Sequence, residues 1–400
     1  MMRNFVFISP HFPDYFWNFV KALRDNGFNV LGVGDCPYES LSNELKQYLS
    51  DYYCCYDMEN FDREVDAVRY FNYKYGEIEY IESMNEYWLE RDARLREIFN
   101  VKNGPRPDEL VYWQKKSLMK EKYKLAGLKT AKYQIVGEKE ELLNFIKKVG
   151  YPVFIKPNIG VGAEGDYKIK NEEDLDNFYK VKNPYVEYIC EQFLSGNIIS
   201  FDGIADADSN VVFAASNFFP PSIASIVQNK KDLFYYTLPN VPFKLLEIGK
   251  KTIKAFKVNN RYFHLEFFIL TEDVVGFAKK GEIIPLETNM RPAGGYTPHM
   301  INFANSIDTF KIYADVLAFG ENKQLSVGGH FFCACASRRD EFRYIHSDYD
   351  IYDKYQAKLC FCGRYADVLS GAMGNRFFMA KFVKEEDMEN FREYVEARDE

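Results

Sequence analysis

The chain has 400 residues, of which 47% are hydrophobic and 28% charged, and its formal net charge at pH 7 is −8. This length supports two or three domains with sizeable cores, and the composition is that of an ordinary soluble globular protein. Acidic and basic residues are interspersed without a basic block, which disfavours nucleic acid or an anionic membrane as a partner.

The amino-terminal segment does not have the pattern of a secretory signal. Its apolar run is short and is interrupted by Pro10, His11 and Asp14. No run of about 18 apolar residues occurs, so we expect no membrane-spanning helix. Eight cysteines in a long chain without such a signal favour a reducing compartment, and we expect a cytoplasmic protein with free thiols.

The first hundred residues alternate between predicted strands and helices. Apolar runs predict strands at 4–9, 28–34, 52–56 and 77–82. Helical spacing of apolar residues predicts helices at 15–26 and 63–75, each followed by a glycine that can end a helix. This alternation predicts a parallel sheet covered by helices. The glycine fingerprint of dinucleotide-binding sheets does not follow the first strand, so a dinucleotide site is not expected.

The remaining chain begins with a turn-rich stretch at 100–110, which indicates a linker between domains. A long helix is predicted over 113–127, and another helix at 138–150 lies between strands at 132–137 and 151–157. A β-rich block follows, with strands at 188–194, 198–206, 211–218, 261–270 and 282–289. The chain ends with helices near 301–320 and 386–399 around strands that contain cysteines.

These last strands contain two cysteine pairs, Cys333/Cys335 and Cys360/Cys362, each with one intervening residue. On a strand this spacing places both sulfur atoms on one face. Four thiols on neighbouring strands would suit zinc, but structural zinc sites usually have two to four intervening residues. Burial as small hydrophobic residues is the favoured interpretation.

Three side chains with oxygen donors lie in two predicted apolar strands. Glu266 is in FHLEFF, whereas Glu287 and Asn289 are two residues apart in IPLETN and project from one strand face. Two carboxylates and an amide suit one or two Mg²⁺ ions that also hold phosphate oxygens. Arg291 follows on the same predicted face, where it would neutralise a transferring phosphoryl group. Each of these residues alone could equally well belong to the solvent-facing side of a half-buried sheet. Together they favour a site for Mg²⁺ and phosphate.

A glycine-rich turn follows the predicted strand that ends at Lys156, and it contains Gly160, Gly162 and Gly165. Glycines allow backbone N–H groups to approach phosphates, and a lysine adds positive charge. The spacing differs from the GxxxxGK[ST] pattern of P-loops. Glycine-rich turns are common, and Lys116 on an upstream helix is by itself more simply a solvated residue.

The order of these motifs resembles that of the ATP-grasp superfamily, in particular stand-alone carboxylate–amine ligases and carbamoyl-phosphate-synthase-like proteins. The resemblance extends from about residue 115 to 320. It implies an α/β (α+β) ATP-grasp fold with a Rossmann-like parallel-sheet domain, a small lid subdomain and a larger antiparallel-sheet domain. The implied units are an N-terminal α/β domain at 1–110, a lid subdomain at 111–195, a core with the metal-binding sheet at 196–320, and a substrate or packing subdomain at 321–400.

The resemblance also implies residue roles. Lys116 lies eleven residues before Gly127 of an "aG" turn, and together with Lys156 it would contact the nucleotide phosphates. The glycines of the lid would cover the nucleotide. The hinge EQFL would hold the adenine, largely through backbone groups, with the residues Glu191, Gln192, Phe193 and Leu194. The implied metal ligands are Glu266, Glu287 and Asn289, and Arg291 is the implied catalytic residue.

Two features depart from the family pattern. Gly196 follows the hinge, but Ile198 takes the place of a glutamate near the ribose or magnesium, which leaves the ribose contacts open. The loop at 272–282 between the two metal-bearing strands is longer than usual.

The implied activity is ATP-dependent, ADP-forming ligation of a carboxylate to an amine, through an acyl phosphate, with a carbon–nitrogen bond as the product. The implied cofactors are ATP and one or two Mg²⁺ ions, with Mn²⁺ as an alternative. The partners are small-molecule carboxylate and amine substrates, and a homodimer is left open. Arg338 and Arg339 are candidates to bind the substrate carboxylate, although a solvated strand end explains them more simply.

Two alternative functions are carried forward. One is an ATP-grasp regulatory protein that binds a nucleotide without ligase turnover. The loss of a metal ligand would indicate such a protein. The other is a bicarbonate-phosphorylating, carboxylase-type enzyme. That family follows its arginine with a Val-Glu-His segment, whereas PAGGYTPHM follows Arg291 here.

Overall fold

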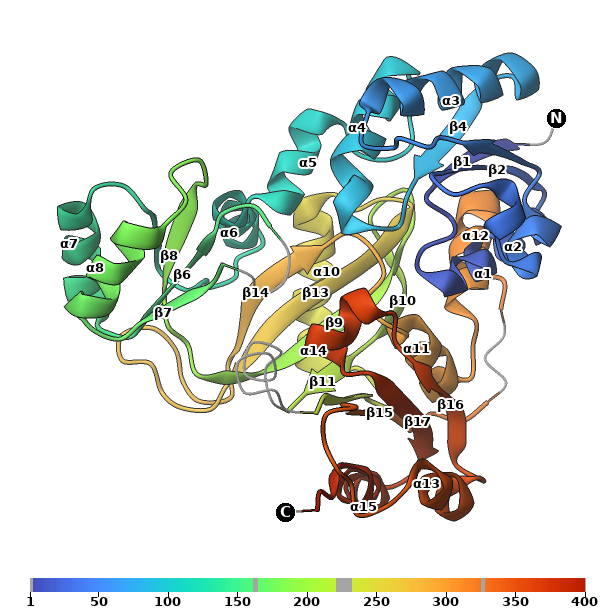
Figure 1. Ribbon diagram of the computed structural model, residues 1–400. Helices are drawn as coiled ribbons and strands as arrows, with labels where there is room; N and C mark the ends of the chain where they lie inside the picture. The colour runs from blue at the N-terminus through green and yellow to red at the C-terminus, as the bar shows by residue number, and fades with distance from the viewer. Residues whose placement is uncertain (1–2, 161–164, 221–231, 325–327, 400) are drawn as a thin grey trace.

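The computed structural model describes residues 3–160, 165–220, 232–324 and 328–399. Within these ranges the strands form three sheets, and none of the described helices has the length and apolar character needed to span a membrane. Figure 1 shows the amino-terminal sheet on one side of the molecule and a small sheet at the opposite end. The largest sheet lies between them and extends towards the carboxyl terminus.

The amino-terminal sheet is parallel, with the strand order β3-β2-β1-β4, as the sequence predicts. Its strands are β1 (Arg3–Ile8), β2 (Phe28–Gly34), β3 (Asp51–Cys54) and β4 (Ile78–Glu82). Its α-helices are α1 (Trp17–Asp25), α2 (Asn43–Tyr48), α3 (Phe61–Tyr75) and α4 (Leu89–Ile98). Alternate residues of β1 enter two separate cores, one formed with α1 and the other with α3 and α4. Both faces of the sheet are therefore covered, which explains the continuous apolar runs of its strands.

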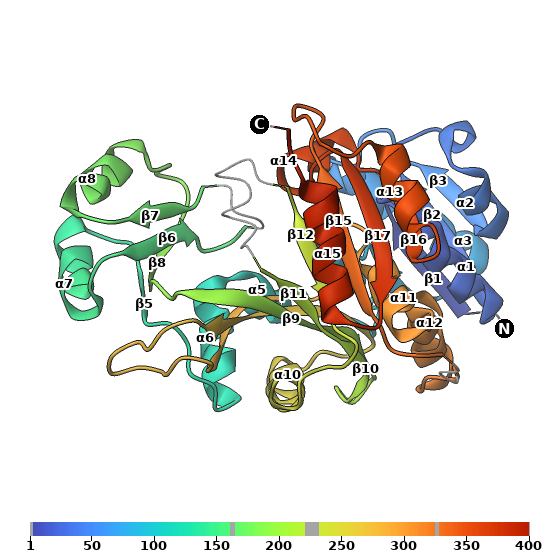
Figure 2. The same ribbon diagram turned by 90° about the horizontal axis from the view of Figure 1, so that it is seen from below.

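The small sheet is antiparallel, with the strand order β5-β8-β6-β7. Its strands are β5 (Tyr133–Ile135), β6 (Val153–Pro157), β7 (Tyr167–Ile169) and β8 (Tyr188–Gln192). One core joins this sheet to the helices α7 (Lys139–Val149) and α8 (Glu172–Val181). The sheet and its two helices form a separate lobe in both views (Figures 1 and 2).

The largest sheet has nine strands in the order β14-β13-β9-β11-β12-β15-β17-β16, with β10 paired to β9, and its pairs are antiparallel. The first strands are β9 (Gly196–Ala205), β10 (Val211–Ala215), β11 (Asn217–Phe219) and β12 (Phe234–Thr237). The later strands are β13 (Arg261–Leu270), β14 (Ile283–Asn289), β15 (Phe332–Arg338), β16 (Leu359–Arg364) and β17 (Arg376–Phe382).

The helices that cover this sheet come from several parts of the chain. They are α5 (Pro107–Gln114), α6 (Lys116–Leu125), α10 (Phe243–Phe256), α11 (Thr297–Asn305), α12 (Thr309–Phe319), α13 (Asp348–Tyr355), α14 (Ser370–Met373) and α15 (Glu385–Glu396). Helix α12 also packs against α1, so the core of the amino-terminal domain includes residues from far along the chain.

The single long helix expected over 113–127 is a wrong prediction. Lys115 has an extended backbone with φ −85° and ψ 109°, and it separates α5 from α6. Helix α5 begins inside the predicted linker because Pro107 occupies its first turn, where a missing N–H is tolerated. The break makes Lys116 the first residue of α6 and brings its backbone N–H to Asn158 O, at 2.8 Å. The start of α6 is thereby attached to the loop that follows β6.

The two cysteine pairs lie on strands that are not adjacent, because β17 separates β15 from β16. Cys333 and Cys335 are fully buried in an apolar core, and burial raises the pKa of both thiols. Among the described residues, no group of three or more His, Cys, Asp and Glu side chains is arranged to hold a metal ion.

Candidate active site

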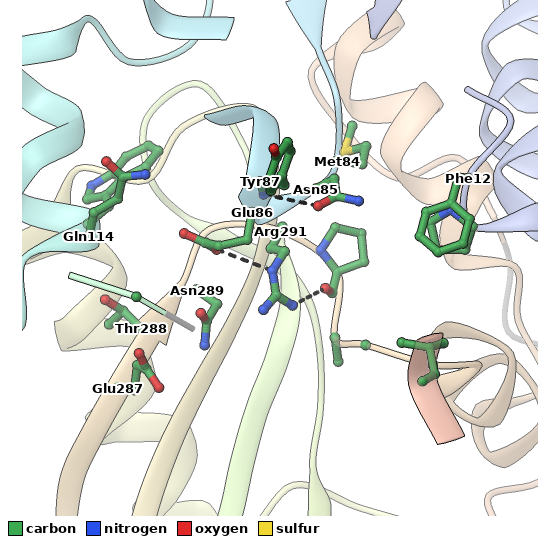
Figure 3. A pocket seen from close by; sticks show the side chains of 18 of the residues that line it. Phe12, Met84, Asn85, Glu86, Tyr87, Gln114, Glu287, Thr288, Asn289 and Arg291 are labelled. Carbon is green, nitrogen blue, oxygen red and sulfur yellow. Dashed lines mark hydrogen bonds and ion pairs between the residues drawn. The ribbon is translucent and has the colours of Figure 1, made fainter. Parts of the chain in front are cut away.

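Glu266 and Glu287 face one another across the antiparallel pair β13–β14, and His264 faces Asn289 in the same ladder. Two like charges directly opposite in a sheet repel one another. Lys116 offsets part of this charge, with its Nζ 3.4 Å from Glu287 Oε1. Figure 3 shows Glu287 and Asn289 on the same side of β14, as the two-residue spacing predicts.

His264 lies between two carboxylates. Its Nδ1 is 2.6 Å from Asp202 Oδ1, and its Nε2 is 3.2 Å from Glu266 Oε1. Burial alone would lower the pKa of His264, but the two carboxylates raise it to about 10. Burial would likewise raise the pKa of Glu266, whereas His264 and Arg291 bring it below its usual value. His264 is therefore an imidazolium that keeps Glu266 ionised and fixes its orientation.

The second lysine of the site, Lys156, lies at the end of β6 and is buried. Its Nζ is 2.8 Å from Glu191 Oε2, and Lys120 forms an ion pair with the other oxygen of this carboxylate. Burial opposes ionisation of Glu191, but the two lysines lower its pKa to about 2. Lys116 donates to Gly160 O at 2.7 Å, so it also contacts the start of the glycine-rich turn.

The EQFL segment begins at the end of β8 and leads into the large sheet. Glu191 turns towards the lysines, and Leu194 is buried against residues of β13 and β14. Gln192 has a buried side-chain oxygen, Oε1, for which the described residues provide no hydrogen-bond partner. A buried acceptor of this kind is ready to receive a donor from a ligand.

Arg291 does not continue the strand, which ends at Asn289. Its Nε lies 3.2 Å from Glu86 Oε2, and its Nη1 donates to Pro292 O at 2.9 Å (Figure 3). Arg291 therefore lies beyond the strand, in the bend that follows Asn289. The residue nevertheless lines one cavity of about 420 Å³ together with Glu287 and Asn289.

Residues 115–217 match the family model described as the ATP binding domain of the carbamoyl-phosphate synthase L chain. The L-amino acid ligase structure from Bacillus licheniformis superposes with a TM-score of 0.71 at 13% identity, covering 98% of this chain and 96% of that chain. The chain has an ATP-grasp fold. The ADP complex of N5-carboxyaminoimidazole synthetase from Staphylococcus aureus has a TM-score of 0.67 at 17% identity with this ATP-grasp chain, covering 98% and 97% of the two chains.

Curated relatives of this ATP-grasp protein match over shorter stretches. The L-arginine-specific L-amino acid ligase of Bacillus subtilis is 25% identical over 236 residues, which are 57% of this chain and 55% of the relative. The D-alanine–D-alanine ligase B of Clostridium perfringens is 36% identical over 87 residues, which are 21% of this chain and 29% of the relative. The chain therefore spans about half the length, or less, of these two curated relatives.

The donor set of this ATP-grasp protein fits Mg²⁺, because hard carboxylate and amide oxygens are its preferred protein ligands. Lys116 and Lys156 fit phosphate groups, because both place a positive charge near Glu287. Gly165, with φ +80°, belongs to the expected phosphate-binding turn, and Gly162 lies outside the described residues.

Sequence reasoning missed four residues that complete the site of this ATP-grasp protein, namely Glu86, Lys120, Asp202 and His264. Two of them had local signals. Lys120 is one helical turn after Lys116, and His264 is two residues before Glu266, so each pair shares a face. No local sequence pattern indicates Asp202 or Glu86. Asp202 reaches the site from β9, and Glu86 reaches it from the amino-terminal domain.

Arg338 and Arg339 do not line the cavity beside Arg291. Arg338 is buried and donates to the backbone oxygens of Val395 and His346. Arg339 donates to the backbone oxygens of Ser370 and Gly371. Their location disfavours the suggested role in binding the substrate carboxylate. The alternative of a solvated strand end is also wrong for Arg338, whose side chain is 1% exposed.

Proposed function

We propose that this protein is an ATP-dependent carboxylate–amine ligase that releases ADP and phosphate. The observation that carries the proposal is the pair of facing carboxylates, Glu266 and Glu287, beside Lys116 and next to a cavity that contains Arg291. The names of the ligases similar in sequence or structure support the same reaction class.

In the proposed reaction, a substrate carboxylate oxygen attacks the γ-phosphorus of ATP, the bond to the β-phosphate oxygen breaks, and ADP leaves. An amine then attacks the acyl carbon, phosphate leaves, and the nitrogen loses a proton to give the amide. Lys116 and Lys156 would neutralise the phosphates, while Glu191 keeps Lys156 in place. Arg291 would stabilise the transferring phosphoryl group and the later oxyanion.

Glu266, Glu287 and Asn289 would hold one or two Mg²⁺ ions. Bound there, Mg²⁺ would supply positive charge to the phosphate oxygens. His264 would keep Glu266 ionised and oriented, since an outer partner of a ligand commonly fixes its geometry.

The domain divisions at residues 110, 195 and 320 are also part of this proposal. The small sheet ends at Gln192 and β9 begins at Gly196, which supports the boundary at 195. The segment 321–400 supplies β15–β17 to the same large sheet as β9. We therefore propose that this segment extends the sheet and closes one side of the cavity, where Leu369 contributes to the lining.

An isotope experiment tests the acyl-phosphate route. With an ¹⁸O-labelled carboxylate substrate, we expect one label in the released inorganic phosphate, because a carboxylate oxygen becomes the bridging oxygen of the intermediate. Mass spectrometry of phosphate and of any AMP measures the outcome. Label in AMP would show attack at the α-phosphorus and would contradict the proposal.

Replacing Arg291 by lysine tests its role in the same reaction. Lysine keeps the charge but loses the planar fork of the guanidinium. We expect kcat to fall roughly ten- to a thousandfold, the range for loss of a preorganised donor, while ATP binding weakens much less. Steady-state release of ADP and calorimetric binding of ATP separate the two effects. A variant with the wild-type kcat would assign Arg291 a structural role.

A further inference from the structure

The cavity beside Arg291 opens at a particular point of the amino-terminal sheet. In the order β3-β2-β1-β4, the chain proceeds from β1 to β2 and β3 on one side and then returns to place β4 on the other. Ligands of open parallel sheets bind outside the carboxyl ends of the strands where this reversal occurs. Residues that follow β1 and residues that follow β4 form one wall of the cavity, opposite the end of β14.

This wall is largely apolar. Side chains after β1 and β4 and from α5 and α6 line the cavity, namely Tyr15, Phe16, Met84, Trp113 and Met119. All five residues are at least nine-tenths buried, so their positions are fixed by packing on their far sides. A cavity of about 420 Å³ lies in the size range of small-molecule sites. It therefore suits a large apolar group.

Two opposite charges lie on the rim of this apolar space. Arg291 and Glu86 share one contact, the 3.2 Å distance from Nε to Oε2, rather than the two parallel contacts that an arginine and a carboxylate can form. Both side chains are largely buried, at 18% and 15% exposed. Burial raises the pKa of Glu86 above its usual value, and the charge of Arg291 limits this rise.

The charge pair restricts which carboxylate can bind. A substrate with only a carboxylate would compete with Glu86 for Arg291 and would leave the Glu86 charge buried without a partner. Such a charge is strongly unfavourable. A substrate that also has an ammonium group beside its carboxylate satisfies both protein charges. An α-amino acid has these two groups on adjacent carbons.

We propose that the activated substrate is an α-amino acid with a free amino group and a large apolar side chain. Glu86 binds the ammonium, Arg291 faces the carboxylate, and the apolar wall holds the side chain. This inference rests on the proposed ligase function, and it adds the substrate class and the role of Glu86.

Hydroxylamine trapping tests the substrate class without knowledge of the amine substrate, since hydroxylamine converts an acyl phosphate into a hydroxamate and phosphate. The panel is L-phenylalanine, L-leucine and L-methionine, with L-alanine, L-glutamate and 3-phenylpropionate for comparison. We expect kcat/KM for L-phenylalanine to exceed that for 3-phenylpropionate, which lacks the ammonium, by at least about thirtyfold. The large apolar amino acids should also exceed L-alanine and L-glutamate.

The variant Glu86→Gln should largely abolish the preference for L-phenylalanine over 3-phenylpropionate. Glu90→Gln, an exposed change four residues further along, should leave it intact. Equal use of L-phenylalanine and 3-phenylpropionate by the wild type, or an unchanged preference in Glu86→Gln, would overturn the ammonium assignment. Preference for L-alanine or L-glutamate would overturn the apolar assignment.

A binding measurement keeps this inference separate from the ligase function. If the wild type forms no hydroxamate with any carboxylate, the proposed function fails, and calorimetry with L-phenylalanine and 3-phenylpropionate then decides the inference. Tighter binding of L-phenylalanine that is lost in Glu86→Gln would support the site. Equal or undetectable binding of both compounds would overturn it.

Discussion

Glu287→Gln is expected to reduce Mg²⁺-dependent turnover by about a thousandfold, because several kcal/mol of charge stabilisation by a metal is at stake. Glutamine keeps the size of the side chain and one carbonyl oxygen, but it removes one of the two facing negative charges. It also removes the ion partner of Lys116. ADP release measured over a range of Mg²⁺ concentrations should show both a lower kcat and a higher Mg²⁺ requirement.

The fold should tolerate this change. The Glu287 side chain is 21% exposed at the cavity, while Met290 is buried in the core that includes residues of α5, α6 and α10. Glu272→Gln, in the exposed loop between β13 and β14, is the matched control and should behave as the wild type. An unchanged kcat with an ordinary Mg²⁺ dependence in Glu287→Gln would remove this residue from the metal site.

The alternation of apolar runs was sufficient to predict the parallel sheet, because each buried strand and each amphipathic helix has a local pattern. Local pattern failed where tertiary contacts decide the structure. Helix α10 contains Gly249, which lowers helix propensity. A Cβ at this position would lie 2.3 Å from the ring of Phe201, so the glycine allows the helix to pack closely on the sheet. No signal within the helix itself indicates that neighbour.

The same distinction applies to the candidate site. Glu287 and Asn289 are predictable as neighbours because two-residue spacing on a strand fixes their common face. The facing of Glu266 and Glu287 depends on the register of two strands joined by a long loop. Glu86 pairs with Arg291 although 205 residues separate them, so only the packing of two domains brings them together.

That packing depends on a buried cluster of charges at the end of β4, just before Glu86. Glu82 accepts two hydrogen bonds from Arg261 of β13, at 3.0 and 2.6 Å, and its Oε1 lies 2.9 Å from Arg96 of α4. The exposed fractions of Arg96 and Arg261 are 0% and 1%. Arg261 also donates to Met290 O at 2.9 Å, next to Arg291. The cluster therefore connects the amino-terminal sheet to β13 and to the segment that leads to Arg291.

Glu82→Ala is expected to lower the free energy of unfolding by about 3–5 kcal/mol, because it leaves two buried guanidinium groups without their shared carboxylate. Glu79→Ala is the matched control on the same strand. Glu79 pairs with Arg3 at 2.7 Å, but both side chains are more than one third exposed, so its loss should cost less than about 1 kcal/mol. Urea unfolding followed by circular dichroism compares the two variants with the wild type.

If Glu82→Ala does not fold, Glu82→Gln keeps hydrogen-bond acceptance without the charge and should show an intermediate loss of stability. Since the cluster joins two domains, the variant should also weaken binding of L-phenylalanine, provided that the cavity wall depends on this connection. Equal urea midpoints for the Glu82 and Glu79 variants would show that the buried arginines find other partners. The position of Glu86 would then have to be set by the packing of its own turn, not by the charges beneath it.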